Sequence, residues 1–472
     1  MKLNRIMIAA PKSGSGKTVI TCALLKALKD RGWQAVAYKC GPDYIDPLFH
    51  EKIIGVPSKN LDTFFTGEEQ TRRLFLKNRT EHDFAVLEGV MGLYDGLGGV
   101  RQEGSSYHLA CITNTPIVLV ADVKGMGRSM IPLLAGFLRF DRKHLIQGVI
   151  LNRISQGYYE IIKPLIEEEL KIPVAGFLPE KEELHIESRH LGLCMPDEIR
   201  DIQKKLQAAS EELQKAVSID TIVKIAESAQ EMREGTEADG RGTGDQEMGA
   251  RKMDAHNLRP ETGVTIAVAK DEAFCFYYQD NIALLEENGA KIEYFSPLWD
   301  DKLPDGCHAL LFGGGYPELY VRELGENVKM CEAVREASKS GMPIVAECGG
   351  FLYLHKTMTD QKGNRYNMAG VISGDCYDTG KSVRFGYIEL REKKNCFLPD
   401  NMVIKGHEFH YYDSTNNGED AVAVKPVTGR TYSCMIIDKT HWMGFPHLYY
   451  PSNPAFVKSL VEKAKRYRES IT

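Results

Sequence analysis

Apolar runs of strand length recur along the first part of the chain, and amphipathic or charged segments separate them. The runs read RIMIAA, QAVAYKC, DFAVLEG, PIVLVAD, LIQGVILNR and PVAGFLPE, and the last of them ends near residue 180. Strands that alternate with helices in this way are typical of a parallel α/β sheet. We therefore expect a first α/β domain over residues 1–195.

The pattern then changes twice. Residues 200–230 are charged with helical periodicity, and residues 231–261 lose apolar periodicity, which predicts a flexible linker within a segment that spans 196–262. A second strand series begins with GVTIAVAKD and continues through HALLFGGG and PIVAECGG. Later stretches such as SVRFGYIEL and MVIKGHEFHYY alternate like antiparallel strands. The sequence thus predicts a second α/β domain over 263–472 with an antiparallel extension.

Composition narrows the class of protein. A chain of 472 residues is too long for one core, and 43% hydrophobic with 26% charged residues is typical of globular domains. The net charge of -6 gives no reason to expect nucleic acid or an anionic membrane as a partner. The apolar run before Pro11 is too short for a signal peptide and no later run could span a membrane, so a cytoplasmic location is expected. Eleven cysteines without a C-x-x-C pair indicate reduced thiols.

The stretch RIMIAAPKSGSGKT, followed by an amphipathic helix to Asp30, has the strand, loop and helix of a phosphate-binding loop. Its glycines allow unusual backbone angles, and the helix start directs N–H groups at phosphate. Lys17 is expected to reach the outer phosphates of ATP, and the Thr18 hydroxyl to hold Mg²⁺. A dinucleotide site fits less well, because Val19 stands where a third glycine would be expected. The residues expected to bind nucleotide are Lys12, Gly14, Ser15, Gly16, Lys17 and Thr18.

Acidic residues follow two of the predicted strands. Asp43 and Asp46 come after the second strand, and Glu88 ends a buried one. The carboxyl ends of parallel strands meet at one edge of a sheet, where ligands bind. Magnesium takes one or two protein carboxylates together with phosphate oxygens. We therefore expect Thr18, Asp43 and Glu88 at the metal and Asp43 and Asp46 at the substrate, while a turn-capping role for Asp46 stays open.

Cys348 lies between a buried strand and an apparent helix, with two glycines behind it, which is the pattern of a nucleophile elbow. A thiolate there could attack a carboxamide, and the N–H of Gly349 could donate to the oxyanion. The GGG run after another strand supplies further donors, of which we expect Gly314 and Gly315 to act. The base should be a histidine, and chemistry alone does not choose among His407, His410 and His447.

Two family resemblances bear on these patterns. The loop with Pro11 in place of the first glycine resembles the branch of P-loop proteins that includes dethiobiotin synthetase and the partitioning ATPases, and Lys12 stands where the latter carry a signature lysine. A homodimer therefore stays open. The segments GPDYIDP, EGVMGLYDG, FGGGYPELY, AECGGFLYL, GHEFHY and HLYYPSNP together resemble the cobyrinic acid a,c-diamide synthase family across nearly the whole chain.

That resemblance implies a dethiobiotin-synthetase-like amide synthetase domain followed by a class I type glutamine amidotransferase domain, with Cys348 as nucleophile and His447 as base. Tyr449 stands where the class I triad carries a glutamate, so the resemblance leaves open what orients His447. The implied reaction uses ATP and glutamine to amidate the a and c acetates of cobyrinic acid through acyl phosphates, in cobalamin biosynthesis.

Other readings stay open beside this one. Close relatives act on nickel-sirohydrochlorin or hydrogenobyrinic acid with the same motifs, and cobyric acid synthase shares both domains. A partitioning-type ATPase switch would account for Lys12 and the phosphate loop, but it would leave Cys348 and His447 without a purpose.

Overall fold

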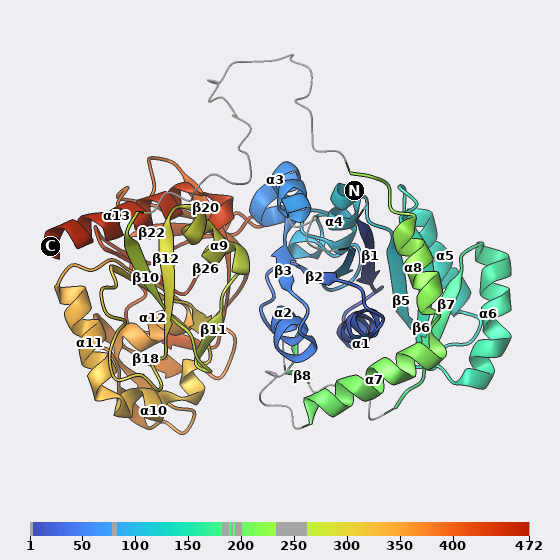
Figure 1. Ribbon diagram of the computed structural model, residues 1–472, viewed down its shortest axis with the longest axis horizontal. Helices are drawn as coiled ribbons and strands as arrows, with labels where there is room; N and C mark the ends of the chain where they lie inside the picture. The colour runs from blue at the N-terminus through green and yellow to red at the C-terminus, as the bar shows by residue number, and fades with distance from the viewer. Residues whose placement is uncertain are drawn as a thin grey trace, which may run out of the picture. The chain divides into compact units, whose positions relative to one another are not determined.

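The computed structural model describes residues 3–77, 83–181, 188–189, 192–193, 201–232 and 262–471. The chain divides into two compact units, Met1–Arg241 and Gly242–Thr472, which run from blue to green and from yellow to red in Figure 1. Each unit is built around its own α/β sheet.

The first unit has a seven-stranded sheet of order β3-β2-β4-β1-β5-β6-β7, and every neighbouring pair is parallel. Its strands are β1 (Asn4–Ala9), β2 (Ala35–Cys40), β3 (Ser58–Leu61), β4 (Phe84–Glu88), β5 (Ile117–Asp122), β6 (Ile146–Asn152) and β7 (Val174–Leu178). All six strands expected from the apolar runs are confirmed. β3 was not predicted, because its SKNL sequence has only one apolar residue although most of the strand is buried.

Helices connect these strands, as the periodicity predicts. They are α1 (Lys17–Asp30), α2 (Ile45–Leu48), the π-helical η1 (Phe49–Ile54), α3 (Thr63–Lys77), the short 3₁₀ turn η2 (Leu97–Gly99), α4 (Ser106–Thr113), α5 (Met130–Phe140) and α6 (Gln156–Leu170). A small antiparallel pair, β8 (Ser188–Arg189) and β9 (Gly192–Leu193), follows later in the chain.

The charged segment after the first sheet folds onto that sheet's unit. α7 (Ile202–Ala216) contacts α1 and β7, and α8 (Ile219–Glu227) contacts β1, β6 and β7 (Figure 1). One face of α7 is apolar and buried, with Ile202, Leu206 and Leu213 at helical spacing. The linker expected over 231–261 lies outside the described residues from 233 onward.

The second unit has a six-stranded sheet of order β12-β10-β13-β15-β25-β24, parallel except at its last pair. The expected antiparallel extension is confirmed by a five-stranded sheet, β23-β22-β19-β20-β26, and a four-stranded sheet, β17-β16-β18-β21, accompanies it. The strands are β10 (Val264–Ala269), β11 (Phe274–Phe276), β12 (Ala290–Phe295), β13 (Ala309–Phe312), β14 (Gly314–Gly315), β15 (Ile344–Glu347), β16 (His355–Thr359), β17 (Arg365–Asn367), β18 (Ile372–Asp378), β19 (Arg384–Glu392), β20 (Val403–His410), β21 (Tyr412–Ser414), β22 (Ala421–Val424), β23 (Thr431–Cys434), β24 (Ile436–Ile437), β25 (His441–Gly444) and β26 (His447–Leu448).

Helices cover both faces of the main sheet of this unit. They are α9 (Gln279–Glu287), η5 (Pro317–Leu319), α10 (Val321–Glu326), α11 (Val328–Lys339), α12 (Gly349–Leu354), η6 (Tyr450–Ser452) and α13 (Ala455–Ile471). Alternate residues of β10 enter different apolar clusters, Ala267 with Ala269 on one face and Ile266 with Val268 on the other. Burial on both faces is typical of a parallel sheet. No helix among the described residues is long and apolar enough to cross a membrane.

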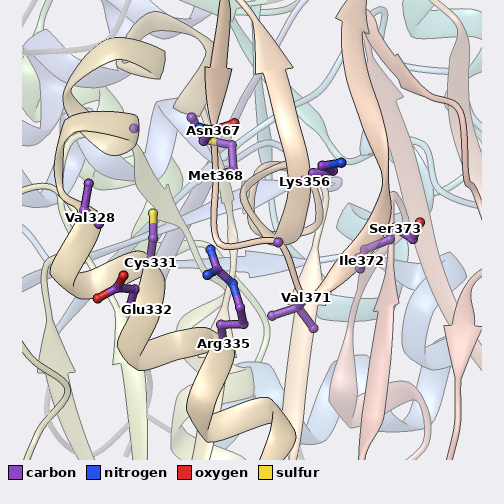
Figure 2. A pocket seen from close by; sticks show the side chains of 12 residues that line it. Val328, Cys331, Glu332, Arg335, Lys356, Asn367, Met368, Val371, Ile372 and Ser373 are labelled. Carbon is purple, nitrogen blue, oxygen red and sulfur yellow. The ribbon is translucent and has the colours of Figure 1, made fainter.

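A cavity of about 560 Å³ opens in the second unit beside α11. Figure 2 shows Arg335 and Cys331 on this helix facing Met368 and Val371 from the neighbouring strands and loops. The Nε of Arg335 donates to the carbonyl of Ala369 at 2.7 Å, so the guanidinium is fixed by main chain. Cys348 does not line this cavity, which is therefore separate from the elbow described below.

Candidate active sites

The phosphate-binding loop lies where the connections of the first sheet diverge. β1 lies between β4 and β5, and the chain leaves β1 through α1 toward β2 but leaves β4 through α4 toward β5 on the other side. Ligands of such sheets bind at the carboxyl ends of the strands at this switch point. Because Ile8 of β1 is the register partner of Glu88 on β4, the loop after β1 and Glu88 meet there.

Two side-chain contacts and two glycines shape the loop itself. Gly14 and Gly16 have φ angles of 73° and 91°, in the left-handed region that favours glycine. Asn152, at the end of β6, donates to the carbonyl of Ser15 at 2.9 Å, and Arg153 donates to that of Gly14 at 3.3 Å. A Cβ on Gly16 would lie 2.4 Å from Asn152 Nδ2, so only glycine allows this close approach.

Lys12 and Lys17 of the loop lie in different surroundings. The Lys12 side chain is 70% exposed, and its Nζ lies 3.8 Å from Asp122, which also pairs with Arg153 at 3.1 Å. Lys17 is buried at the start of α1, and its Nζ donates to the carbonyl of Met91 at 2.6 Å. Burial, with the nearby charge of Lys39, lowers the pKa of Lys17 to about 8. Lys17 is thus held by the EGVMG segment.

Glu88 is the centre of a buried polar cluster. Its Oε1 accepts a hydrogen bond from Thr18 Oγ1 at 2.6 Å and lies 2.9 Å from Lys39 Nζ. Its Oε2 lies 3.2 Å from His50 Nε2. Burial opposes ionisation, but the charge of Lys39 and the neighbouring His50 outweigh it and hold the pKa of Glu88 well below its usual value. Glu88 is therefore a carboxylate joined directly to the loop threonine.

Lys39 and His50 were not predicted from the sequence. Lys39 is the register partner of Glu88 on β2, and it also forms an ion pair with Asp46. Although burial works against it, these two carboxylates hold the pKa of Lys39 well above its usual value. The signal that could have revealed it is a lysine inside QAVAYKC, an otherwise apolar strand. His50 is fixed at its other nitrogen, where Nδ1 lies 3.0 Å from Ser58 Oγ.

The two aspartates after β2 have structural partners. Asp46 is 3% exposed, and its carboxylate contacts Lys39. Asp43 is half-buried, and its Oδ1 accepts the N–H of Ile45 at 2.8 Å, as turn-capping aspartates do. The structure therefore brings Thr18, Glu88 and Asp46 into one cluster through Lys39, and it places Asp43 at the turn beside them.

The described residues contain no group of three or more His, Cys, Asp or Glu side chains that could hold a metal ion. Magnesium at a nucleotide needs less, because phosphate oxygens and water supply most of its ligands. The Thr18 hydroxyl and Glu88 Oε1, 2.6 Å apart, are the oxygen donors that fit this requirement. Asp43 fits less well, because its Oδ1 is already bonded to the turn.

In the second unit, Cys348 occupies a sharp turn between β15 and α12. Its φ of 46° and ψ of -102° are unusual for a residue with a side chain, and such strain is often found at functional sites. Its N–H donates to the carbonyl of Gly444 at 2.9 Å, and its carbonyl accepts from Leu352 at 3.0 Å. A Cβ on Gly350 would lie 2.4 Å from Phe312 Cβ, so the turn packs directly on β13. The elbow predicted from the sequence is present.

The glycine run of β13 and β14 lies against this elbow. A Cβ on Gly349 would be 3.1 Å from the amide nitrogen of Gly315 and 2.8 Å from Pro317 Cδ. The backbones that carry the Gly315 and Gly349 N–H groups therefore approach each other closely. Gly313 differs from the other two glycines of the run, because its N–H donates to the Tyr277 hydroxyl at 2.8 Å.

His447 lies at the same place. A Cβ on Gly314 would be 2.3 Å from His447 Cε1, so the imidazole packs on the glycine run that also contacts the elbow. Burial, with a smaller effect of His410, lowers the pKa of His447 to about 3. Burial, followed by the charge of Glu318, raises the pKa of the Cys348 thiol. Burial therefore favours a neutral imidazole and a thiol over an ion pair at this site.

The other two candidate histidines have different neighbours. The His407 ring stacks on His447, with centroids 4.9 Å apart and planes at 15°. The His410 ring stacks on Phe445, with centroids 3.8 Å apart and planes at 4°. Tyr449, in the position of the class I glutamate, donates to Asp280 at 2.8 Å.

The main chain around His447 is held on both sides. Asn281 donates to the carbonyl of Leu448 and accepts from the N–H of Tyr450, both at 2.8 Å. Glu347, which precedes the cysteine, accepts the Leu448 N–H at 3.4 Å. The segment of the histidine is thus connected to both α9 and β15.

Two family models match the chain in the order of its units. Residues 6–193 match the CobQ/CobB/MinD/ParA nucleotide binding domain, and residues 265–441 match the CobB/CobQ-like glutamine amidotransferase domain. The fold class expected from the sequence is confirmed by these matches and by the two sheets.

Curated relatives match over nearly the full length. Proteins named cobyrinate a,c-diamide synthase from Caldanaerobacter subterraneus subsp. tengcongensis, Clostridium acetobutylicum and Clostridium tetani are 36%, 38% and 37% identical to this chain. The alignments cover 98%, 97% and 98% of this chain and 98%, 100% and 100% of the relatives. Among solved structures, the MinD cell division protein of Aquifex aeolicus aligns with 48% of this chain and 95% of its own, at 17% identity and a TM-score of 0.29.

Proposed function

The chain belongs to the family of cobyrinate a,c-diamide synthases, and from this premise we propose that it amidates the a and c acetate groups of cobyrinic acid with ATP and glutamine. It is then a carbon–nitrogen ligase with glutamine as the amido donor, as its two family matches indicate. The observation that carries the proposal is the joint presence of a phosphate loop bonded to Glu88 and of a glycine run against which both the cysteine elbow and His447 lie.

The first unit would activate the acid. A carboxylate resists attack by ammonia because it is negatively charged and its oxygen leaves poorly. Transfer of the γ-phosphoryl group to that oxygen gives an acyl phosphate and ADP. Lys17, once it leaves the Met91 carbonyl, and the N–H groups at the start of α1 would stabilise the charge on the transferred group. Mg²⁺ bound by Thr18 and Glu88 would add positive charge at the same oxygens.

The second unit would supply ammonia. His447 would accept the thiol proton of Cys348 as the sulfur attacks the glutamine carboxamide, and the N–H groups of Gly315 and Gly349, whose backbones approach each other closely, would stabilise the oxyanion. Ammonia leaves with the proton, and water hydrolyses the thioester to glutamate. Ammonia then attacks the acyl phosphate carbon, phosphate leaves and the amide forms. Each amide would thus consume one ATP and one glutamine.

The choice of macrocycle is supported by the names of the relatives. Nickel-sirohydrochlorin and hydrogenobyrinic acid remain the alternative acceptors for the same mechanism. A nucleotide-driven switch of the partitioning type would use Lys12, whose side chain is 70% exposed, but it assigns no role to the elbow at Cys348.

The division of labour is tested with Cys348→Ala. We expect this variant to lose glutamine-dependent amidation and to retain amidation from a high concentration of ammonium salt, because the synthetase site belongs to the other unit. Lys17→Ala is the matched control, which should lose both. Loss of ammonia-dependent amidation in folded Cys348→Ala protein would contradict the proposal.

The acceptor is tested by mass spectrometry of a time course with cobyrinic acid, ATP, Mg²⁺ and glutamine. Two acetates cannot occupy one reaction point together, so a monoamide should precede the diamide. Rapid amidation of nickel-sirohydrochlorin with none of cobyrinic acid would overturn the substrate while leaving the ligase chemistry in place.

A further inference from the structure

His407 and His447 are joined across two strands of the antiparallel sheet. They are register partners on β20 and β26, so their side chains leave the same face of the sheet next to each other. Their rings lie nearly parallel, with planes at 15° and centroids 4.9 Å apart. His407 is 9% exposed and His447 is 3% exposed, so the pair is enclosed by protein.

His407 contacts Tyr278, the residue that directly precedes α9. The Tyr278 hydroxyl lies 3.2 Å from His407 Nδ1, within hydrogen-bond distance. The Tyr278 ring also makes edge contacts with His407 and with Tyr449, at 6.4 Å and 5.2 Å between centroids. His447 thus packs between the Gly314 backbone and a histidine whose own orientation is fixed by a tyrosine.

We propose that His407 is a positioning residue for His447, taking the part that a carboxylate plays in the class I triad. The proposal rests on the proposed function, because it assumes that His447 is the base for Cys348. Asn281 and Glu347 hold the main chain of residues 448–450, and the His447 ring itself packs on the Gly314 backbone. The flat His407 ring stacked on the face of His447 further limits rotation of the imidazole about its side-chain bonds.

If His407 positions His447 by ring contact, substitutions that keep a flat ring and substitutions that remove it should have different effects. His407→Phe keeps a flat ring on His447 and loses the nitrogen near Tyr278. His407→Ala removes the ring altogether. A catalytic proton transfer through His407 would be lost equally in both variants, whereas positioning by contact would be largely restored in the phenylalanine variant.

The experiment measures glutamine hydrolysis and ammonia-dependent amidation in full-length His407→Ala, His407→Phe and Tyr278→Phe proteins. We expect His407→Ala to lower kcat for glutamine hydrolysis by roughly thirtyfold with KM within about twofold, a loss equal to about 2 kcal/mol. His407→Phe should recover to within about fivefold of the parent chain, and Tyr278→Phe should lose about threefold to fivefold. Ammonia-dependent amidation should be unchanged in all three.

The matched control is His441→Ala. His441 is a histidine of the same unit whose Nε2 lies 2.9 Å from Ser338 Oγ, outside the elbow site. It should leave glutamine hydrolysis unchanged. Tyr278→Phe removes one hydroxyl only, so it tests the proposal even where His407→Ala fails to fold.

The outcomes distinguish failure of the positioning role of His407 from failure of the proposed function. Unchanged kcat in His407→Ala, or equal losses in the alanine and phenylalanine variants, would overturn the positioning role. A rise in KM with kcat unchanged would also overturn it, since that assigns His407 to substrate binding. Absence of glutamine hydrolysis in the parent chain would instead refute the proposed function.

Discussion

Lys39 on β2 and Glu88 on β4 are register partners on neighbouring strands, and the Lys39 ammonium lies 2.9 Å from Glu88 Oε1. Both side chains are almost completely buried, at 5% and 0% exposure. The carboxylate that contacts Thr18 of the phosphate loop is therefore held by a cation from the adjacent strand. Its charge and its position depend on a residue that lies outside the phosphate-binding loop.

Lys39→Met should destabilise the first unit and abolish ATP-dependent amidation. Removing one partner of a buried ion pair leaves the other charges uncompensated, at a cost of about 3–5 kcal/mol. Glutamine hydrolysis should persist, because Cys348 belongs to the second unit. Thermal unfolding and the two activities check this result.

Lys26→Ala is the control for charge removal. Lys26 pairs with Asp30 at 2.7 Å on the exposed face of α1, where such pairs contribute less than about 1 kcal/mol. We expect both activities and the unfolding temperature to stay near those of the parent chain. If Lys39→Met behaved like Lys26→Ala, the buried cluster would have no structural role.

Lys17→Ala should lower ATP-dependent amidation by on the order of a hundredfold, since charge contacts to a transferred phosphoryl group are worth roughly 3 kcal/mol. Initial rates with ammonia as donor measure this directly, because they bypass the second unit. Full amidation activity in the variant would remove the phosphate loop from the mechanism.

Gly314→Ala should lower the rate of glutamine hydrolysis by more than about tenfold. The new Cβ would lie 2.3 Å from His447 Cε1, so the ring would have to move. Ammonia-dependent amidation should be retained. Gly136→Ala is the control, since nothing lies within 4 Å of a Cβ at that glycine, and it should change neither activity.

Glutamine hydrolysis should show no inflection near pH 6.5 in kcat/KM. Burial lowers the pKa of His447 to about 3, so the base is already neutral throughout the range from about pH 5 to 8. The rate should fall only at more acidic pH, where the imidazole takes up a proton. A half-maximal rate near pH 6.5 would show that His447 is solvated or paired in the working enzyme.

Glu347→Gln should stabilise the second unit increasingly as pH rises from about 5 to 8. Burial raises the pKa of Glu347 to about 8, so the native state keeps a proton that the unfolded chain loses above its ordinary value near 4.5. The free energy of unfolding therefore falls through this window, by up to about 4 kcal/mol. The Glu347→Gln substitution removes that pH dependence, because the amide side chain does not titrate. Heat inactivation of glutamine hydrolysis at pH 5 and pH 8 measures the difference, and an equal effect at both pH values would contradict the assignment.

The amino-acid sequence alone was enough to predict the local structures, which depend on neighbouring residues. A strand, a glycine loop and a helix start in that order are typical of a phosphate-binding loop, so the local structure around Lys17 could be predicted. The elbow at Cys348 could be predicted for the same reason, because the strand before it and the helix after it can both be inferred from adjacent residues. β3 escaped prediction because its short SKNL run lacks the apolar pattern from which strands are inferred.

The residues that support these local structures become visible only in the folded protein. Lys39 and His50 meet Glu88, and His407 meets His447, through strand register and packing that join residues far apart in the chain. Periodicity gives the face on which a side chain emerges, but not the strand that will lie beside it. The choice among the histidines could therefore not be made from spacing: the Gly314 backbone contacts His447, whereas His410 packs on Phe445.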